Sequence, residues 1–213
     1  MKRVVWDWNG TLFDDLHIVV EAVNRGIAHY GVGPIDLDLY RAHYTRPVRL
    51  FYDRLFGRPV TTEEWSALDA RFHDGYRELL DHAAPHADAV DALEKVATEG
   101  LPQSLLSMFP HRELIPLVER MGLAAFFDRI DGLEGPPGES KALYLEAHLA
   151  VLIGDTDPAE VVVIGDTPDD AVAANHVGAR CVLFDSGAHH RTHLEATGVP
   201  VVESLVDAVS WRW

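Results

Sequence analysis

Apolar runs alternate with amphipathic stretches along the second part of the chain, which indicates strands interleaved with helices. Residues 161–164 read Val-Val-Val-Ile, and an unbroken apolar run of this kind is typical of a strand buried on both faces. Shorter apolar stretches predict further strands at 4–6, 104–107 and 180–184, and Arg129-Ile130-Asp131 is a candidate for another short strand. Helices are expected at 88–99, 111–121, from about 140 onwards, and at 169–176. The alternation predicts an α/β fold with a Rossmann-like, doubly wound parallel sheet.

A long helical pattern without a convincing strand separates the first strand from the others. It opens at about residue 15 with apolar side chains at helical spacing, and Gly31 stops that helix. Residues 36–58 predict one or two short helices, and Thr61 with Glu64 has the spacing of a capping box. The apolar stripe behind this box consists of Trp65, Leu68, Phe72, Tyr76 and Leu79. We therefore expect a small all-α cap domain at 15–84, inserted into a core formed by 1–14 and 85–213.

The composition is ordinary for a globular protein, but the charge is strongly negative. The chain is 47% hydrophobic, which is enough for a sizeable core. It carries 34 acidic residues against 18 lysines and arginines, a net charge of -16. Such a surface argues against nucleic acid or an anionic membrane as the main partner. An anion site must therefore be locally positive.

The single cysteine, Cys181, lies in an apolar run and is expected to be a buried strand residue. One cysteine cannot form an intramolecular disulfide, which favours a reducing compartment and hence a cytoplasmic location. No signal peptide is recognisable, and no run approaches the roughly 18 apolar residues of a transmembrane helix. The oligomeric state stays open between a monomer and a homodimer.

Polar side chains follow the predicted strands, at the edge where open parallel sheets bind ligands. Asp7 comes directly after the first strand, in a turn formed by Asn9 and Gly10. Gly10 lets the backbone approach an anion, and Thr11 offers an N–H and a hydroxyl group. Ser107 ends the next core strand with another hydroxyl. Taken alone, Asp7 is also compatible with capping a turn, and serines often end strands.

Lys141 and a cluster of acids complete this set of polar positions. Lys141 stands at an expected helix start, where its charge adds to the positive helix terminus; a solvated surface lysine is the alternative. Asp166, Asp169 and Asp170 gather after the strand at 161–164. Crowded carboxylates repel one another, and a hard cation such as Mg²⁺ relieves that repulsion. Helix capping by Asp166 or Asp169 is the other interpretation.

In their order and separations, these positions resemble the four motifs of the haloacid dehalogenase-like superfamily, over essentially the whole chain. The family's motifs are Asp-x-Asp-Gly-Thr, a strand ending in Ser or Thr, a Lys, and Gly-Asp-x-x-x-Asp. The matching positions are Asp7-Trp8-Asn9-Gly10-Thr11, Ser107, Lys141, and Gly165-Asp166 with Asp170. The inserted helices resemble the cap of the phosphoglycolate phosphatase-like subgroup.

The resemblance implies a magnesium-dependent phosphatase that acts on a small phosphorylated metabolite. Asp7 would attack phosphorus and form an aspartyl-phosphate, which water then hydrolyses. Mg²⁺ would be held by Asp7, the backbone carbonyl of Asn9 and Asp166, with Asp170 steadying the site. Lys141 would assist catalysis. The expected phosphate-binding positions are Asn9, Gly10, Thr11, Ser107, Met108 and Lys141.

The main departure from the family pattern is Asn9, which stands where relatives carry the Asp that acts as general acid and base. An amide cannot exchange a proton in that way, and such help is typically worth about 10² to 10⁴ in rate. The substrate could be an acyl or aryl phosphate that needs no acid. A cap histidine, His17, His29 or His43, could substitute. The protein could also be a slow or inactive phosphate-binding or interaction protein. Met108 is a second, smaller departure.

Basic residues of the cap are candidates for binding the substrate. Arg46 and Arg49 flank Pro47 and could clamp a carboxylate or a second phosphate; a solvated helix face is the alternative. A haloacid dehalogenase stays a further alternative, disfavoured because that reaction needs no metal. Three histidines lack a partner at metal-ligand spacing and are expected on a mobile surface loop: His189, His190 and His193.

Overall fold

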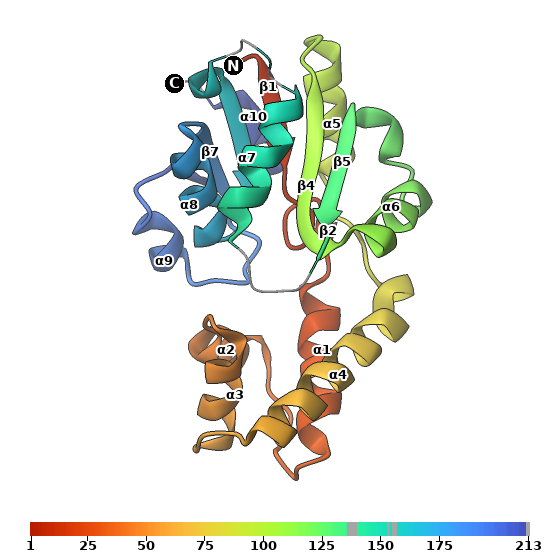
Figure 1. Ribbon diagram of the computed structural model, residues 1–213, viewed down its shortest axis with the longest axis vertical. Helices are drawn as coiled ribbons and strands as arrows, with labels where there is room; N and C mark the ends of the chain where they lie inside the picture. Colours follow the sequence, from red (N-terminus) through yellow and green to blue (C-terminus); the bar gives the residue numbers. More distant parts are fainter. Residues whose placement is uncertain (136–139, 153, 155–156, 212–213) are drawn as a thin grey trace. The chain divides into compact units, whose positions relative to one another are not determined.

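The computed structural model describes residues 1–135, 140–152, 154 and 157–211. The chain divides into two compact units, which Figure 1 shows in ribbon form. We call them the core unit, Met1–Asp14 with Pro85–Trp213, and the helical unit, Asp15–Ala84.

The core unit is built on one parallel sheet. Among the described residues, this sheet has six strands in the order β5-β4-β1-β6-β7-β8. Their bounds are β1 Arg3–Trp6, β4 Gln103–Pro110, β5 Arg129–Leu133, β6 Val161–Gly165, β7 Arg180–Phe184 and β8 Val201–Val202. Each neighbouring pair is parallel. The expected α/β fold with a parallel sheet and a helical insertion is confirmed.

The order of the strands places β1 at a topological switch point. From β1 the chain continues to β4 on one side, and it returns to β6 on the other. The carboxyl ends of these three strands meet at one edge of the sheet, because all of them run in the same direction. Ligands of doubly wound folds bind at such a point.

Helices and short 3₁₀ turns connect the strands of the core unit. Their bounds are α5 Ala89–Thr98, α6 His111–Arg120, η2 Ala124–Phe126, α7 Lys141–Leu152, η3 Pro158–Glu160, α8 Pro168–Val177, α9 Arg191–Glu195 and α10 Leu205–Ser210. The helices α7 and α8 pack against each other, as do α5 and α10. Alternate strand residues, such as Val163 and Leu183, join the apolar side of α7 and α8 in one buried cluster. The intervening residues, such as Val162 and Ile164, are buried as well.

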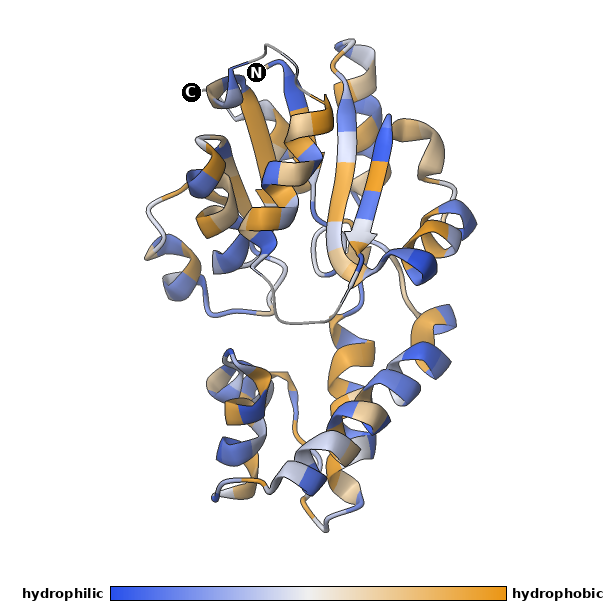
Figure 2. Cartoon of the chain, viewed as in Figure 1, coloured by the Kyte–Doolittle hydropathy of each residue, from blue (hydrophilic) through white to orange (hydrophobic). Residues whose placement is uncertain are grey.

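Burial on both faces explains which strands the sequence reveals most clearly. Figure 2 shows β7 in orange over most of its length, whereas β5, at the edge of the sheet, alternates between blue and orange. All of β6 is buried, and so is Cys181 on β7, as expected. Burial also raises the pKa of the Cys181 thiol.

The structure corrects several expected boundaries in the core unit. The strand expected at 104–107 continues to Pro110. Neither β8 nor α10 was expected, because two and six residues are too short for a periodic pattern. His193 lies in α9 and not in a loop, while His189 and His190 precede that helix.

The helical unit consists of helices and one 3₁₀ turn: α1 Leu16–Ala28, α2 Leu37–His43, α3 Val48–Phe56, α4 Thr62–Leu79 and η1 Leu80–His82. Its longest helix, α4, begins with the expected capping box between Thr61 and Glu64. The hydroxyl of Tyr76 on α4 donates to the buried carboxylate of Asp15 at 2.6 Å. Two short strands, β2 (Phe13–Asp14) and β3 (Ala84–Pro85), form a separate two-stranded sheet.

A buried hydrogen-bond network joins α7 to two strands. His148 on α7 lies 2.7 Å from a carboxylate oxygen of Asp131 on β5, through Nδ1, and 2.9 Å from the hydroxyl of Ser104 on β4, through Nε2. A carboxylate only accepts, so Nδ1 carries the proton and Nε2 accepts from Ser104. Burial holds the pKa of His148 below its ordinary value, with Asp131 opposing. The network fixes α7 against the sheet.

Within the described part of the chain, no helix combines the length and the apolar character that a membrane crossing requires.

Candidate active site

Asp7 lies at the carboxyl end of β1, where the sheet positions its backbone. Its N–H donates to the carbonyl of Ile164 on β6 at 2.8 Å. The chain then turns sharply, because the N–H groups of Thr11 and Phe13 both donate to the Trp8 carbonyl, at 3.2 and 2.9 Å. Only 7% of Asp7 is exposed. The turn therefore holds a buried carboxylate at the switch point of the sheet.

Two glycines bring the acids of β6 and α8 close to this turn. Gly10 has a φ of +76°, and a Cβ on it would lie 2.2 Å from a carboxylate oxygen of Asp166. A Cβ on Gly165, the last residue of β6, would lie 2.2 Å from the Asp170 carboxyl carbon. A side chain at either position would displace one of these acids.

Asp170 serves both the helix start and the site. The N–H and the hydroxyl of Thr167 donate to one oxygen of Asp170, at 3.0 and 2.7 Å. Thr167 and Asp170 thus form the capping box of α8. The expected alternative of a helix cap by Asp166 or Asp169 does not hold, since the N-cap residue is Thr167.

Lys141, the first residue of α7, completes the centre of the site. Its ammonium group contacts Asp7 and donates to the other oxygen of Asp170 at 2.5 Å. The side chains involved are nearly buried, with 10% of Lys141, 9% of Asp7 and none of Asp170 exposed. A lysine placed at a helix start is therefore compensated by two carboxylates.

The two carboxylates that share Lys141 differ in their pKa values. Burial raises the pKa of Asp7 from 3.8 to about 6; Lys141 opposes this and Asp170 adds to it. Burial acts on Asp170 too, but Lys141 and the two Thr167 hydrogen bonds outweigh it and lower its pKa. Burial disfavours the charged form of Lys141, yet Asp170 and Asp7 hold its pKa above the ordinary value. The pKa values of the two acids therefore move apart: Asp170 adds to the rise at Asp7, whereas Lys141 and then Thr167 lower that of Asp170.

The donor set fits a magnesium ion. One carboxylate oxygen each of Asp7, Asp166 and Asp170 lies within 4.8 Å of the other two, and all three residues are buried. The Lys141 ammonium pairs with two of these acids, Asp7 and Asp170, and the third, Asp166, accepts from the Thr11 hydroxyl. Oxygen donors gathered in this way are what a hard divalent cation prefers.

The remaining expected phosphate-binding residues of the core unit lie around this centre. The Thr11 hydroxyl is fully buried and shares its proton between Asp7 and Asp166, at 3.4 and 3.3 Å. The Ser107 hydroxyl lies 3.4 Å from the Asn9 amide oxygen and accepts the Phe109 N–H at 3.0 Å. Met108 is half-buried beside it on β4. Direct contacts thus join Asp7 of the first motif to Lys141, the third motif, and Lys141 to Asp170 of the fourth. Ser107, the second motif, joins them through its contact with Asn9.

Arg46 and Arg49 belong to the helical unit. The Arg49 guanidinium donates to the Val60 carbonyl at 2.6 Å, so part of its hydrogen-bonding capacity stabilises that unit. The role of both arginines in binding substrate stays a prediction.

Ser186 is a polar residue of the site that sequence analysis missed. Ser186 follows β7, and its hydroxyl donates to Asp166 at 2.9 Å. Strand order was the missing information, since β7 borders β6 and therefore ends at the same edge. The run at 180–184 was recognised as a strand, so the polar residues after it could have been examined in the same way.

Comparison with known proteins identifies the family. The model of the haloacid dehalogenase-like hydrolases matches residues 1–178, and the chain belongs to this family. A phosphoglycolate phosphatase of Caulobacter vibrioides is 28% identical over 210 residues, covering 96% of this chain and 87% of the relative. Phosphoglycolate phosphatase 1 of Pseudomonas aeruginosa is 25% identical over 212 residues, covering 97% and 78%. The expected resemblance to this subgroup is confirmed.

Solved structures share the fold over nearly the full length. A haloacid dehalogenase-like family protein from Streptococcus pneumoniae has a TM-score of 0.83 at 18% identity, covering 99% of this chain and 97% of its own. A predicted phosphoglycolate phosphatase from Haemophilus somnus has a TM-score of 0.81 at 16% identity, covering 99% and 97%.

Proposed function

We propose that this protein is a magnesium-dependent phosphatase that hydrolyses a small phosphorylated metabolite such as phosphoglycolate, with Asp7 as nucleophile. The observation that carries the proposal is the buried group of Asp7, Asp166 and Asp170 at the switch point of the sheet, two of whose acids, Asp7 and Asp170, pair with the Lys141 ammonium. The family and the names of the full-length relatives support the same reaction class.

The reaction divides into two displacements at phosphorus. An oxygen of Asp7 forms a bond to phosphorus while the bond to the leaving oxygen breaks, which gives an aspartyl-phosphate. The leaving oxygen departs as an anion and takes a proton from solvent. Water then attacks this phosphorus and gives up a proton to solvent, the bond to Asp7 breaks, and inorganic phosphate leaves. Asp7 must be ionised to attack. The Lys141 ammonium favours that ionised form and opposes the effect of burial.

Mg²⁺ would supply positive charge that stabilises the phosphoryl oxygens in the transition state. The residues that would hold it are Asp7, Asp166 and the carbonyl of Asn9, with Asp170 beside them. Lys141, Thr11 and Ser107 would orient the phosphate through an ammonium group and two hydroxyls. A dehalogenase reaction needs no metal and therefore does not require Asp7, Asp166 and Asp170 to be buried together. This grouping favours the phosphatase.

Asn9 sets the expected substrate preference. Its amide can donate a hydrogen bond to the leaving oxygen but cannot give up a proton at neutral pH. Esters with poor leaving groups therefore lack general acid help, whereas acyl and aryl phosphates do not need it. We infer that turnover on acetyl phosphate and p-nitrophenyl phosphate exceeds turnover on phosphoglycolate.

Phosphate release from these three compounds, each with Mg²⁺ and with EDTA, tests the proposal. We expect release that needs Mg²⁺ and is fastest for the two better leaving groups. Release from phosphoglycolate at a similar or higher rate would refute the inference about Asn9. No release from any compound would favour the alternative of a phosphate-binding protein on the same fold.

A further inference from the structure

Ser186 is a polar residue of the core unit that the proposed reaction does not use. It follows the last residue of β7, Phe184, after Asp185, at the same edge of the sheet as Asp166. Its hydroxyl donates to Oδ2 of Asp166 at 2.9 Å and accepts the N–H of Ala188 at 3.4 Å. Because a backbone N–H only donates, the hydroxyl proton of Ser186 is left for the carboxylate.

The Asp166 carboxylate is held at both of its oxygens. The Thr11 hydroxyl lies 3.3 Å from Oδ1, whereas the Ser186 hydroxyl contacts Oδ2. Oδ2 also approaches the backbone so closely that a Cβ on Gly10 would lie 2.2 Å from it. The carboxylate therefore has a fixed orientation, to which Ser186 contributes the shortest of the hydroxyl contacts described for it.

The loop that carries Ser186 is itself anchored to the sheet. The Ser186 N–H donates to the Phe184 carbonyl at 2.9 Å, and the Asp185 N–H donates to the Val202 carbonyl at 2.8 Å. Arg191 pairs with the carboxylate of Asp185 at 3.3 Å. A rigid attachment of this kind allows one hydroxyl to hold a neighbouring carboxylate in place.

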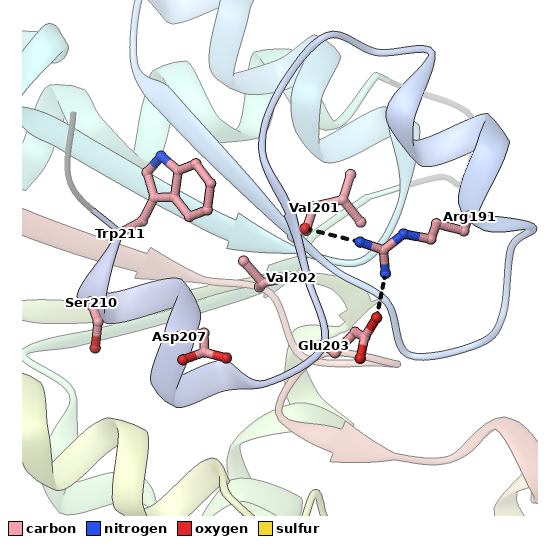
Figure 3. Close-up of a pocket in the computed structure, with 7 residues that line it drawn as sticks. All are labelled: Arg191, Val201, Val202, Glu203, Asp207, Ser210 and Trp211. Atoms are coloured by element: carbon pink, nitrogen blue, oxygen red, sulfur yellow. Dashed lines mark hydrogen bonds and ion pairs between the residues drawn. The ribbon is translucent and has the colours of Figure 1, made fainter.

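The same arginine ties this loop to β8 and the residue after it. Figure 3 shows Arg191 at one end of a surface pocket, reaching the Val201 carbonyl at 3.4 Å and Glu203 at 3.0 Å. The pocket is also lined by Asp207 and Trp211, and Arg191 is the basic residue among those lining it. The Arg191 guanidinium is already paired with carboxylates. Its role at this pocket is therefore to anchor the loop that carries Ser186.

We propose that Ser186 is a positioning residue for the magnesium site, which orients Asp166 before the metal arrives. The inference rests on the proposed function insofar as Asp166 holds Mg²⁺. A ligand carboxylate that is already oriented loses less freedom when the metal binds. Removing a hydrogen-bond partner of a metal ligand typically weakens metal binding by about 10- to 100-fold.

Isothermal titration of the full, EDTA-stripped protein with MgCl₂, without substrate, measures this effect. We expect Ser186→Ala to raise the Kd for Mg²⁺ by about 10-fold or more. The Mg²⁺ concentration for half-maximal phosphate release should rise by the same factor, while kcat at saturating Mg²⁺ stays near that of the unmodified protein. This split between metal affinity and kcat separates positioning from a general loss of structure.

Ser204→Ala is the matched control. Ser204 caps α10 by accepting the Asp207 N–H at 3.2 Å, so its removal destabilises the same unit without a described contact to Asp166. We expect its Kd for Mg²⁺ to equal that of the unmodified protein. A Kd for Ser186→Ala within twofold of the unmodified protein, or an equal loss in both variants, would overturn the role of Ser186. If the unmodified protein binds no Mg²⁺, the metal site of the proposed function fails as well.

Discussion

Replacing the nucleophile with its neutral isostere should stabilise the metal-free protein at alkaline pH. Burial raises the pKa of Asp7 from 3.8 to about 6, although Lys141 opposes that effect. The folded state therefore binds a proton at Asp7 more tightly than the unfolded state does. Ionisation of Asp7 removes stability as the pH rises from about 4 to above 6. The side chain in Asp7→Asn cannot ionise, so the stability of this variant should not fall over that pH range.

The size of the effect follows from the shift. A difference of about 2 pH units corresponds to about 3 kcal/mol, because one unit is worth about 1.4 kcal/mol. Since Asp7 is almost completely buried, solvent does not screen this penalty appreciably. Linkage predicts that Asp7→Asn gains about 3 kcal/mol over the unmodified protein at pH 8, and about half as much at pH 5.

Equilibrium urea unfolding in EDTA at pH 5 and pH 8 measures these free energies directly. Asp14→Asn is a suitable control, since Asp14 is exposed on β2 and the substitution is chemically identical. Added Mg²⁺ should narrow the difference at pH 8, because the metal stabilises the protein that binds it more tightly. An Asp7→Asn variant that is no more stable than the unmodified protein at pH 8 would refute the reasoning.

Three further substitutions have definite expected outcomes. His148→Phe should lower the free energy of unfolding by about 2–4 kcal/mol, because Asp131 and Ser104 lose their hydrogen bonds to the imidazole. A loss of less than about 1 kcal/mol in urea unfolding would contradict this expectation. Tyr76→Phe removes a 2.6 Å hydrogen bond to the buried Asp15 and should cost about 1–3 kcal/mol, visible as a lower melting temperature. Asn9→Asp should raise turnover on phosphoglycolate by about 10² or more, and turnover on p-nitrophenyl phosphate by less. Equal gains in steady-state assays would show that Asn9 does not limit proton transfer.

Elements with a strong local pattern could be predicted from the sequence. The strand β6 is buried on both faces, so every residue of the run at 161–164 is apolar. The polar residues after such strands mark the ligand edge, which is why Asp7 and Asp166 could be proposed together; Ser107 was proposed with them as the end of a strand, whereas β4 continues past it to Pro110. By contrast, β8 and α10 are stabilised by their neighbours in the sheet and by packing, and neither is long enough to show a period.

Contacts between distant parts of the chain could not be predicted in this way. Lys141 meets Asp7 across 134 residues of sequence and Asp170 across 29. The family resemblance suggested that these residues share a site, but the sharing of one ammonium group by two carboxylates is a property of the fold. The capping box of Thr167 with Asp170 is local, yet Asp166 and Asp169 offered competing caps. Ser186 was missed because a serine after a strand carries no signal until the strand order is known.

The most direct test of the central claim is phosphate release from acetyl phosphate by the unmodified protein and by Asp7→Asn, measured side by side with Mg²⁺ and with EDTA. Asp7 as nucleophile predicts steady release by the unmodified protein with Mg²⁺, none above background with EDTA, and none from the variant under either condition. Turnover by Asp7→Asn at a rate comparable to the unmodified protein would contradict the account, because another group would then have to attack phosphorus.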